Sequence, residues 1–213
     1  MRYRGLANAL LAAAAGCGAA AATGAPSGPD FGSAPASSEV RVTAQWVLAV
    51  SDHQRRPFAV VDKREARIYV FDAAGRLQGA SAALLGSARG EVPAPDMARR
   101  TPASLAPAER TTPAGRFASE PGHNDKGEAI VWFDYDAALA VHRLRPGPAG
   151  ERRAQRLASP SPDDNRITLG CVVVPEAFYD EVVAPLLGRR HGVVYMLPEA
   201  GSAQALFAQA RWD

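Results

Sequence analysis

Hydrophobic and polar positions along the chain predict a mainly β domain. Short runs rich in valine, isoleucine, phenylalanine and tyrosine recur from residue 58 onward, and turn-forming residues separate them, as is typical of strands. The predicted strands cover residues 58–62, 66–71, a segment leading to 83–85, a segment from 117, then 129–135, 138–142, 172–174 and 192–197. The first three follow one another through short turns, which predicts a β-meander.

Helical spacing of apolar residues predicts a few helices around these strands. In the segment 39–50, one helical face would collect Val40, Thr43, Trp46, Val47 and Val50. A second helix is expected over residues 175–187, with Pro175 in its first turn, where the missing N–H costs nothing. A helical turn is expected within 151–157, and the chain ends in an amphipathic tail.

Two segments lack such patterns. Residues 89–113 contain five prolines and little periodicity, which predicts a long surface loop. A loop of this length either covers a substrate or is disordered, and the sequence leaves both alternatives open. Residues 143–164 form a second connection rich in proline, glycine and arginine, and it leads directly to the stretch that contains Cys171.

The N-terminus has the features of an export signal, predicted for residues 1–25. Two arginines precede a short apolar core and small residues follow. The residues before Cys17 resemble a lipoprotein cleavage box, and cleavage nearer residue 25 is the alternative. Residues 26–38 are predicted to be a disordered linker, and 39–213 a single domain with its core at about 58–198. We therefore expect export to the bacterial periplasm or cell envelope, with membrane attachment only through a lipid on Cys17.

Composition narrows the functional classes further. The chain has 213 residues, of which 47% are hydrophobic, and a formal net charge of +2. This length suits one globular domain with additional segments at its ends. The near-neutral charge gives no reason to expect a nucleic-acid partner or electrostatic binding to a membrane surface.

Cys171 is the residue most suggestive of chemistry. Gly170 before it allows close approach of a substrate to the backbone, and the strand 172–174 after it would hold the thiol on a rigid element. The alternative is a buried cysteine that acts as a small hydrophobic residue. Since Cys17 would be removed or acylated, Cys171 would be an unpaired thiol in an oxidising compartment, which favours a functional role.

A cysteine nucleophile needs a base, and the chain has four histidines. His53 and His191 lie in arginine-flanked polar turns and His123 in a polar loop, so all three are expected to be solvated. His142 ends an apolar strand and is the best candidate for the base. One cysteine and scattered histidines lack the spacing of metal ligands, so no metal site is expected.

Three parts of the sequence share a pattern with a known family. They are Thr168-Leu169-Gly170-Cys171-Val172 before a strand-to-helix step, with His142 upstream, the earlier Thr112-Pro113-Ala114-Gly115-Arg116-Phe117, and the opening hairpin 59–71 followed by a strand that ends at Leu85-Gly86. Over about residues 58–198 the chain thereby resembles the L,D-transpeptidase (YkuD) catalytic domain. The resemblance implies an L,D-transpeptidase-like β-sandwich with a few flanking helices and no metal or organic cofactor. The chain departs from the family's motif at Leu169, where histidine is usual, and at Val173, where asparagine or arginine is common. His142 and Cys171 are also 29 positions apart, which implies an inserted loop.

The resemblance also implies residue roles. Cys171 would attack a carbonyl of a peptidoglycan stem peptide, His142 would take the thiol proton, and the backbone carbonyl of Arg143 would orient the imidazole. N–H groups around Gly170 and Cys171 would bind the oxyanion, beside the hydroxyl of Thr168.

Three functions remain open at this point. The acyl group could pass to an amine, whose identity the sequence does not give, or to water, as in a peptidase. The third alternative is a non-catalytic envelope-binding protein, which the two departures from the motif favour.

Overall fold

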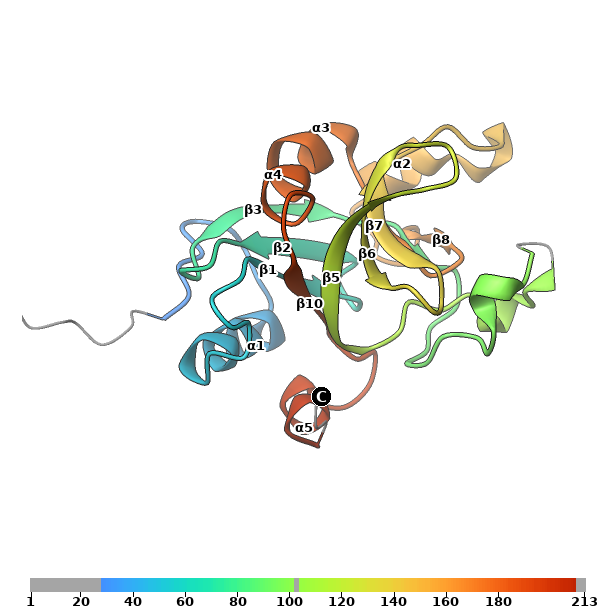
Figure 1. Cartoon of the computed structure of the whole chain (residues 1–213). Coiled ribbons are helices and arrows are strands. Elements are labelled where there is room, and N and C mark those ends of the chain that lie inside the picture. Colours follow the sequence, from blue (N-terminus) through green and yellow to red (C-terminus); the bar gives the residue numbers. More distant parts are fainter. Residues whose placement is uncertain (1–27, 102–103, 210–213) are drawn as a thin grey trace, which may run out of the picture.

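The computed structural model describes residues 28–101 and 104–209, so the predicted export signal and Cys17 lie outside the described residues. Ten strands are defined within these ranges: β1 (Phe58–Asp62), β2 (Arg67–Phe71), β3 (Leu77–Ala82), β4 (Leu85–Gly86), β5 (Gly115–His123), β6 (Ala129–Asp134), β7 (Leu139–Arg143), β8 (Arg166–Thr168), β9 (Val172–Val174) and β10 (Gly192–Met196). The α-helices are α1 (Ser38–Ala49), α2 (Arg153–Ala158), α3 (Glu176–Phe178), α4 (Ala184–Leu186) and α5 (Ala203–Gln209). Figure 1 shows the helices around the strands, which confirms the mainly β fold class. No helix of the described ranges has the length and apolar character that a membrane span requires.

Eight strands form one mixed sheet in the order β3-β2-β1-β10-β5-β6-β7-β9. The pairs β1–β10 and β7–β9 are parallel, and the other neighbours are antiparallel. The predicted β-meander is confirmed, because β1, β2 and β3 pair in succession. The two remaining strands, β4 and β8, pair with each other in parallel.

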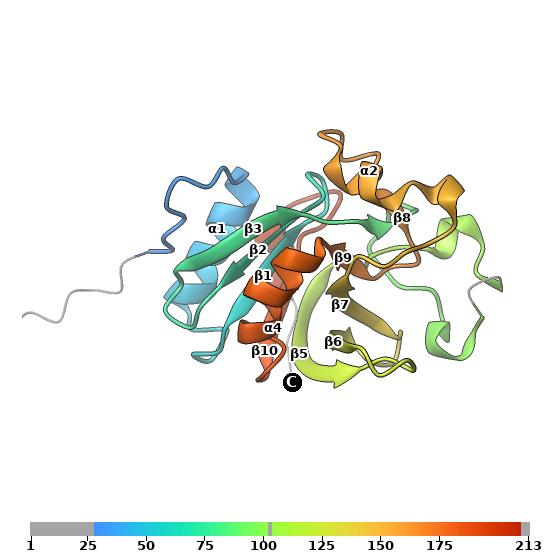
Figure 2. The same cartoon turned by 90° about the horizontal axis from the view of Figure 1, so that it is seen from above.

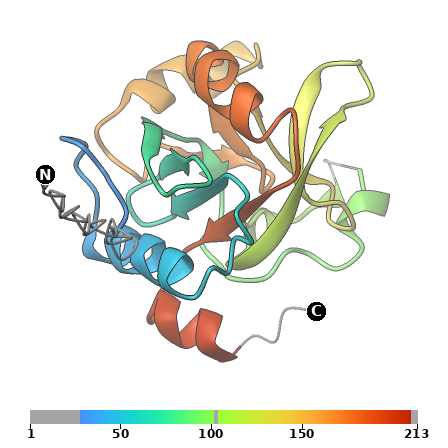
Figure 3. The same cartoon turned by 60° about the vertical axis from the view of Figure 1, so that its left-hand side comes forward.

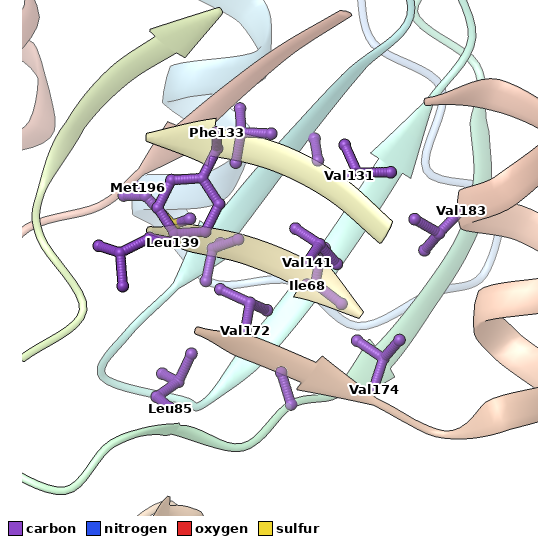
Figure 4. Packing of buried hydrophobic residues seen from close by; sticks show 14 of the residues in the cluster. Ile68, Leu85, Val131, Phe133, Leu139, Val141, Val172, Val174, Val183 and Met196 are labelled. Carbon is purple, nitrogen blue, oxygen red and sulfur yellow. The ribbon is translucent and has the colours of Figure 1, made fainter. Parts of the chain in front are cut away.

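The long strand β5 joins two halves of the sheet. Its residues 115–119 pair with β10 and its residues 120–123 pair with β6, so the sheet turns along β5. Apolar side chains from both halves meet in one core. Figure 4 shows Ile68 of β2 and Met196 of β10 among Val141 of β7 and Val172 of β9. The sheet therefore encloses its main core between its own two halves, as in a sandwich.

A second core covers the outer face of the half of the sheet that contains β3, β2, β1 and β10. The residues of β2 alternate between the two cores, because Ile68 and Val70 face the main core while Tyr69 and Phe71 face the second. Helices α1 and α5 cover this outer face and lie side by side in Figure 3. The ring of Trp46 in α1 stacks on Phe207 in α5, with their centroids 5.7 Å apart.

The predicted helix after β9 is present, but it has an irregular centre. Between α3 and α4, the residues Tyr179–Val183 form a π-helical turn. Pro185 follows in the sequence and cannot donate a backbone hydrogen bond, so the regular α-helical pattern is not available across this position. Pro175 is the N-cap of α3 and not a residue of its first turn. Figure 2 shows this helical segment lying against the sheet.

Part of the predicted disordered linker is ordered. Within residues 28–38, Phe31 is buried, and its ring lies edge-on against Tyr69 and Phe71 of β2. The Tyr69 hydroxyl also donates to the carbonyl oxygen of Pro35. The prediction of disorder was wrong for this part, because one aromatic side chain in a small-residue segment is enough to dock it on the second core.

The segment 89–113 contains two short 3-10 turns, Met97–Arg99 and Pro107–Glu109, in its described part. It is nevertheless attached to the domain, because Ala94, Met97 and Leu105 are buried in the main core.

Candidate active site

His142 lies in β7, and Cys171 directly precedes the neighbouring strand β9. In the parallel pair β7–β9, His142 is opposite Val173 and Val141 is opposite Val172. Because side chains alternate along a strand, a residue two positions before Val173 points to the same face as Val173 and His142. Cys171 and His142 both line one cavity of about 510 Å³. The structure therefore brings together the two residues that the sequence singled out.

A tight turn fixes the backbone before Cys171. Gly170 has a φ of +142°, and a Cβ built on it would lie 2.6 Å from the carbonyl oxygen of Thr111. Only glycine fits this position without displacing neighbouring atoms. The hydroxyl of Thr168 closes the turn, because it donates to the Cys171 carbonyl at 2.7 Å and accepts from the Gly170 N–H at 3.1 Å.

Thr112 holds the same turn from outside. Its buried hydroxyl donates to the Gly170 carbonyl at 2.9 Å and accepts from the N–H of Gly86 in β4, also at 2.9 Å. This side chain thus connects the residue before Cys171 to β4. Sequence analysis noted Thr112 as part of a resembling motif but gave it no role.

The contact that the resemblance implied for the imidazole is present. His142 Nδ1 lies 2.8 Å from the backbone carbonyl oxygen of Arg143. A carbonyl can only accept, so Nδ1 carries the proton and Nε2 has the free lone pair. Burial lowers the pKa of His142 to about 4, the nearby Arg145 and Arg153 lower it too, and the Arg143 carbonyl opposes the shift. The imidazole is therefore neutral at neutral pH and can accept a proton at Nε2.

The thiol is half-buried and uncharged at rest. Cys171 Sγ lies 3.9 Å from the carbonyl oxygen of Ala138, the residue directly before β7. Burial raises the pKa of Cys171, while a hydrogen bond with the backbone of Ala140 and the charge of Arg145 oppose the increase. At rest the cavity thus holds a neutral thiol and a neutral imidazole.

The rest of the cavity is lined by charged and apolar residues. Its charged side chains are Arg110, Arg145, Glu151 and Arg153, and its apolar ones include Ile167, Leu169 and Val173. Arg110 belongs to the segment 89–113, and the other three belong to the connection 143–164. Apart from one helical turn, neither segment has a sequence pattern that predicts a strand or a helix. The sequence alone did not point to these residues, because the local sequence around a loop arginine does not indicate which groups its side chain contacts.

One expected role does not fit the geometry. The N–H of Gly170 was expected among the oxyanion donors, but it is already bonded to Thr168 Oγ1. Of the N–H groups of Gly170 and Cys171, only the Cys171 N–H is therefore available to donate to an oxyanion.

The other histidines lie elsewhere. His123 and His191 are exposed, as predicted. His53 was predicted to be solvated, and this is wrong: it is only 4% exposed. Its ring nitrogens lie 3.4 and 3.2 Å from the carbonyl oxygens of Val47 and Ala73. These contacts, which the polar local sequence does not reveal, explain its burial. Within residues 28–101 and 104–209, no three His, Cys, Asp or Glu side chains come together as metal ligands.

No protein-family model matches the chain, and no curated protein matches it. Among solved structures, it is similar to the catalytic domain of an L,D-transpeptidase from E. faecium, determined by NMR. The two share 15% sequence identity with a TM-score of 0.36, and the alignment covers 67% of this chain and 98% of that one. A similarity this distant does not bear on the chemistry of the site.

Proposed function

We propose that this protein is an exported cysteine acyltransferase that acts on peptidoglycan stem peptides through a thioester on Cys171. One observation carries the proposal: Cys171, directly before β9, and His142, in the adjacent parallel strand β7, share one cavity, and the Arg143 carbonyl fixes the imidazole. The resemblance of the surrounding sequence to L,D-transpeptidases supplies the substrate class. The proposed location, in the periplasm or envelope, rests on the N-terminal sequence.

The chemistry uses the chain's own groups. Sγ of Cys171 attacks the carbonyl carbon of the donor peptide, and the S–H proton passes to Nε2 of His142. The C–N bond to the leaving amino acid then breaks, and the imidazolium returns this proton to the leaving amine. An amine acceptor attacks the thioester, the new C–N bond forms, and the C–S bond breaks. The acceptor's proton passes through His142 back to the thiol.

The electrostatics favour proton transfer during the attack. Burial disfavours both the thiolate and the imidazolium, so a preformed ion pair is not the resting state. The Cys171 N–H can then stabilise the oxyanion as it forms. His142 acts in this proposal as a general base and then a general acid.

Water could replace the amine acceptor, which would make the protein a peptidase with the same thioester. A non-catalytic envelope-binding protein is the second candidate, and the apolar wall of the cavity favours it. Leu169 and Val173 line the cavity at the positions where the family's motif has polar residues. They offer a substrate contact area but no hydrogen bonds.

Intact-protein mass spectrometry after exposure to a carbapenem tests the proposal. This class of acylating inhibitor often reacts with L,D-transpeptidases, so we expect one covalent adduct on the wild type and none on Cys171→Ser. Incubation with a stem tetrapeptide, with and without an amine acceptor, then separates transfer from hydrolysis by the product. The proposal is wrong if neither carbapenem nor tetrapeptide acylates a folded protein whose Cys171 still reacts with a small alkylating reagent. That result would favour the binding protein.

A further inference from the structure

The cavity around Cys171 has an excess of positive charge. Three arginines line it, Arg110, Arg145 and Arg153, against one carboxylate, Glu151. His142 adds no further positive charge at neutral pH, since burial keeps its imidazole neutral. An isolated excess of cations beside a nucleophile is costly unless a ligand or solvent balances it.

Two of these arginines have acidic partners. Arg145 Nε lies 2.6 Å from Glu128 Oε2, and Arg153 pairs with Glu151. Arg145 still lowers the pKa of both Cys171 and His142 by its charge, and Arg153 lowers the pKa of His142. Their charges therefore reach the centre of the cavity despite these partners.

Arg110 differs from them, because in the described part of the chain it forms no ion pair. Its Nε and Nη2 donate to the carbonyl oxygen of Leu105 at 3.2 and 2.9 Å. These two bonds hold the planar guanidinium in place without neutralising it. A fixed, uncompensated guanidinium is well suited to bind a carboxylate, through paired hydrogen bonds or charge alone.

The other side chains from residues 167–173 that line the cavity offer a ligand little polar contact apart from the thiol. Ile167, Leu169 and Val173 are apolar, and the hydroxyl of Thr168 is already bonded to the Cys171 carbonyl and the Gly170 N–H. Orientation of a polar substrate must therefore come from the arginine side of the cavity.

We propose that Arg110, supported by Arg145 and Arg153, forms a carboxylate-binding subsite beside Cys171. The preferred acyl donor then carries a carboxylate close to the carbonyl that the thiol attacks. The identity of the donor as a peptide rests on the proposed function, but the preference of the cavity for anions does not.

Alkylation of Cys171 tests the subsite without any turnover. Iodoacetate and iodoacetamide form the same S–C bond and release the same iodide. They differ because iodoacetate carries a carboxylate where iodoacetamide carries a neutral amide. The rates are measured on the full chain with Cys17→Ser, so that Cys171 is the single thiol of the two in the sequence. The iodoacetate-to-iodoacetamide rate ratio is divided by the ratio for the same chain unfolded in urea, at the same pH and ionic strength.

For a carboxylate about 7 Å from one guanidinium, Coulomb's law with an effective dielectric constant of about 40 to 80 gives about a threefold to eightfold rate preference. We expect the folded ratio to exceed the unfolded one by at least this factor and to fall as salt is added. Arg110→Gln should lower the ratio by about threefold to eightfold, and Arg110→Lys should retain most of it. Arg55→Gln is the matched control, because Arg55 is exposed and lies in a different cavity with Arg56 and Arg190.

The outcomes separate this inference from the proposed function. A folded ratio equal to the unfolded one, or a ratio that Arg110→Gln and Arg55→Gln lower equally, overturns the subsite and leaves the acyltransferase untouched. Failure of the folded protein to react with either reagent overturns both, since both require an accessible thiol.

Discussion

The hydroxyl of Thr112 is the clearest place to test whether the turn before Cys171 is held as the structure indicates. Thr112 is 1% exposed, and its hydroxyl bonds both the Gly170 carbonyl and the Gly86 N–H at 2.9 Å. Thr112→Val keeps the shape of the side chain and removes both bonds. It leaves one backbone donor and one acceptor buried without their partner.

The magnitude follows from these two groups. A buried backbone group that loses its partner costs about 1 to 3 kcal/mol. Partial relaxation of the turn reduces the sum, so we expect Thr112→Val to lower the free energy of unfolding by about 2 to 4 kcal/mol.

A matched control exists in the first helix. Thr43 is also 1% exposed, but its Oγ1 has no hydrogen-bond partner among the residues that the structure describes. Thr43→Val exchanges the same atoms and removes no bond, and the two residues have similar helix propensities. We expect a change within about 0.5 kcal/mol, or a small gain in stability, because an unpaired hydroxyl leaves the core.

Urea unfolding followed by tryptophan fluorescence measures both variants, with equal m-values as the condition for comparison. The interpretation of the turn is refuted if Thr112→Val and Thr43→Val lose the same stability. A loss below about 1 kcal/mol for Thr112→Val would refute it as well, since hydrogen bonds of that value could be made to water.

Three further predictions concern the same site. The folded pKa of His142, about 4, lies below its ordinary value of 6.5, so the unfolded chain binds the proton first and stability falls as pH decreases through this window. The expected loss in the free energy of unfolding is about 3 kcal/mol. Urea unfolding measured from pH 7 to 4 should show a smaller decrease in this free energy for His142→Gln than for the wild type. Equal pH dependence of the two proteins would contradict the lowered pKa. Gly170→Ala places a Cβ 2.6 Å from the Thr111 carbonyl oxygen, whereas Gly127 has a φ of +77° and open space around it. Thermal unfolding should therefore show a larger loss of stability for Gly170→Ala than for Gly127→Ala. Equal losses would mean that the contact with Thr111 relaxes freely. Lys63→Met removes a fully buried ammonium that donates to two carbonyl oxygens and to Glu91. It should lower the free energy of unfolding by about 2 to 4 kcal/mol and speed proteolytic cleavage within residues 89–113. An unchanged rate of cleavage would show that other contacts hold this segment.

The strands that sequence analysis located well are those with strong local patterns. Residues 58–62 and 192–197 are continuous runs of apolar and β-branched residues, and β1 and β10 match them within one residue. Such a run is typical of a strand buried on both faces, and both strands are buried throughout. The signal is local, so the chain alone was sufficient to find it.

β8 was missed for the opposite reason. Its three residues, Arg-Ile-Thr, show no alternation that distinguishes them from a loop, and they form a strand because β4 pairs beside them. The pairing of β7 with β9 is equally non-local. Sequence analysis selected His142 and Cys171 by residue type, but their shared face depends on that pairing.

The segment 89–113 forms part of the wall of the site in this structure. Lys63 is 0% exposed, and its Nζ donates to Gly90 O at 2.5 Å and to Thr112 O at 2.9 Å, close to the two ends of the segment. A buried ammonium can keep its charge only if it retains such partners, so the two ends are held together. The far end carries both Arg110, in the cavity wall, and Thr112, on the Gly170 carbonyl. The hydrogen bonds of Lys63 therefore position the turn before Cys171 and the proposed anion subsite together. A change at the ends of the segment should affect both at once.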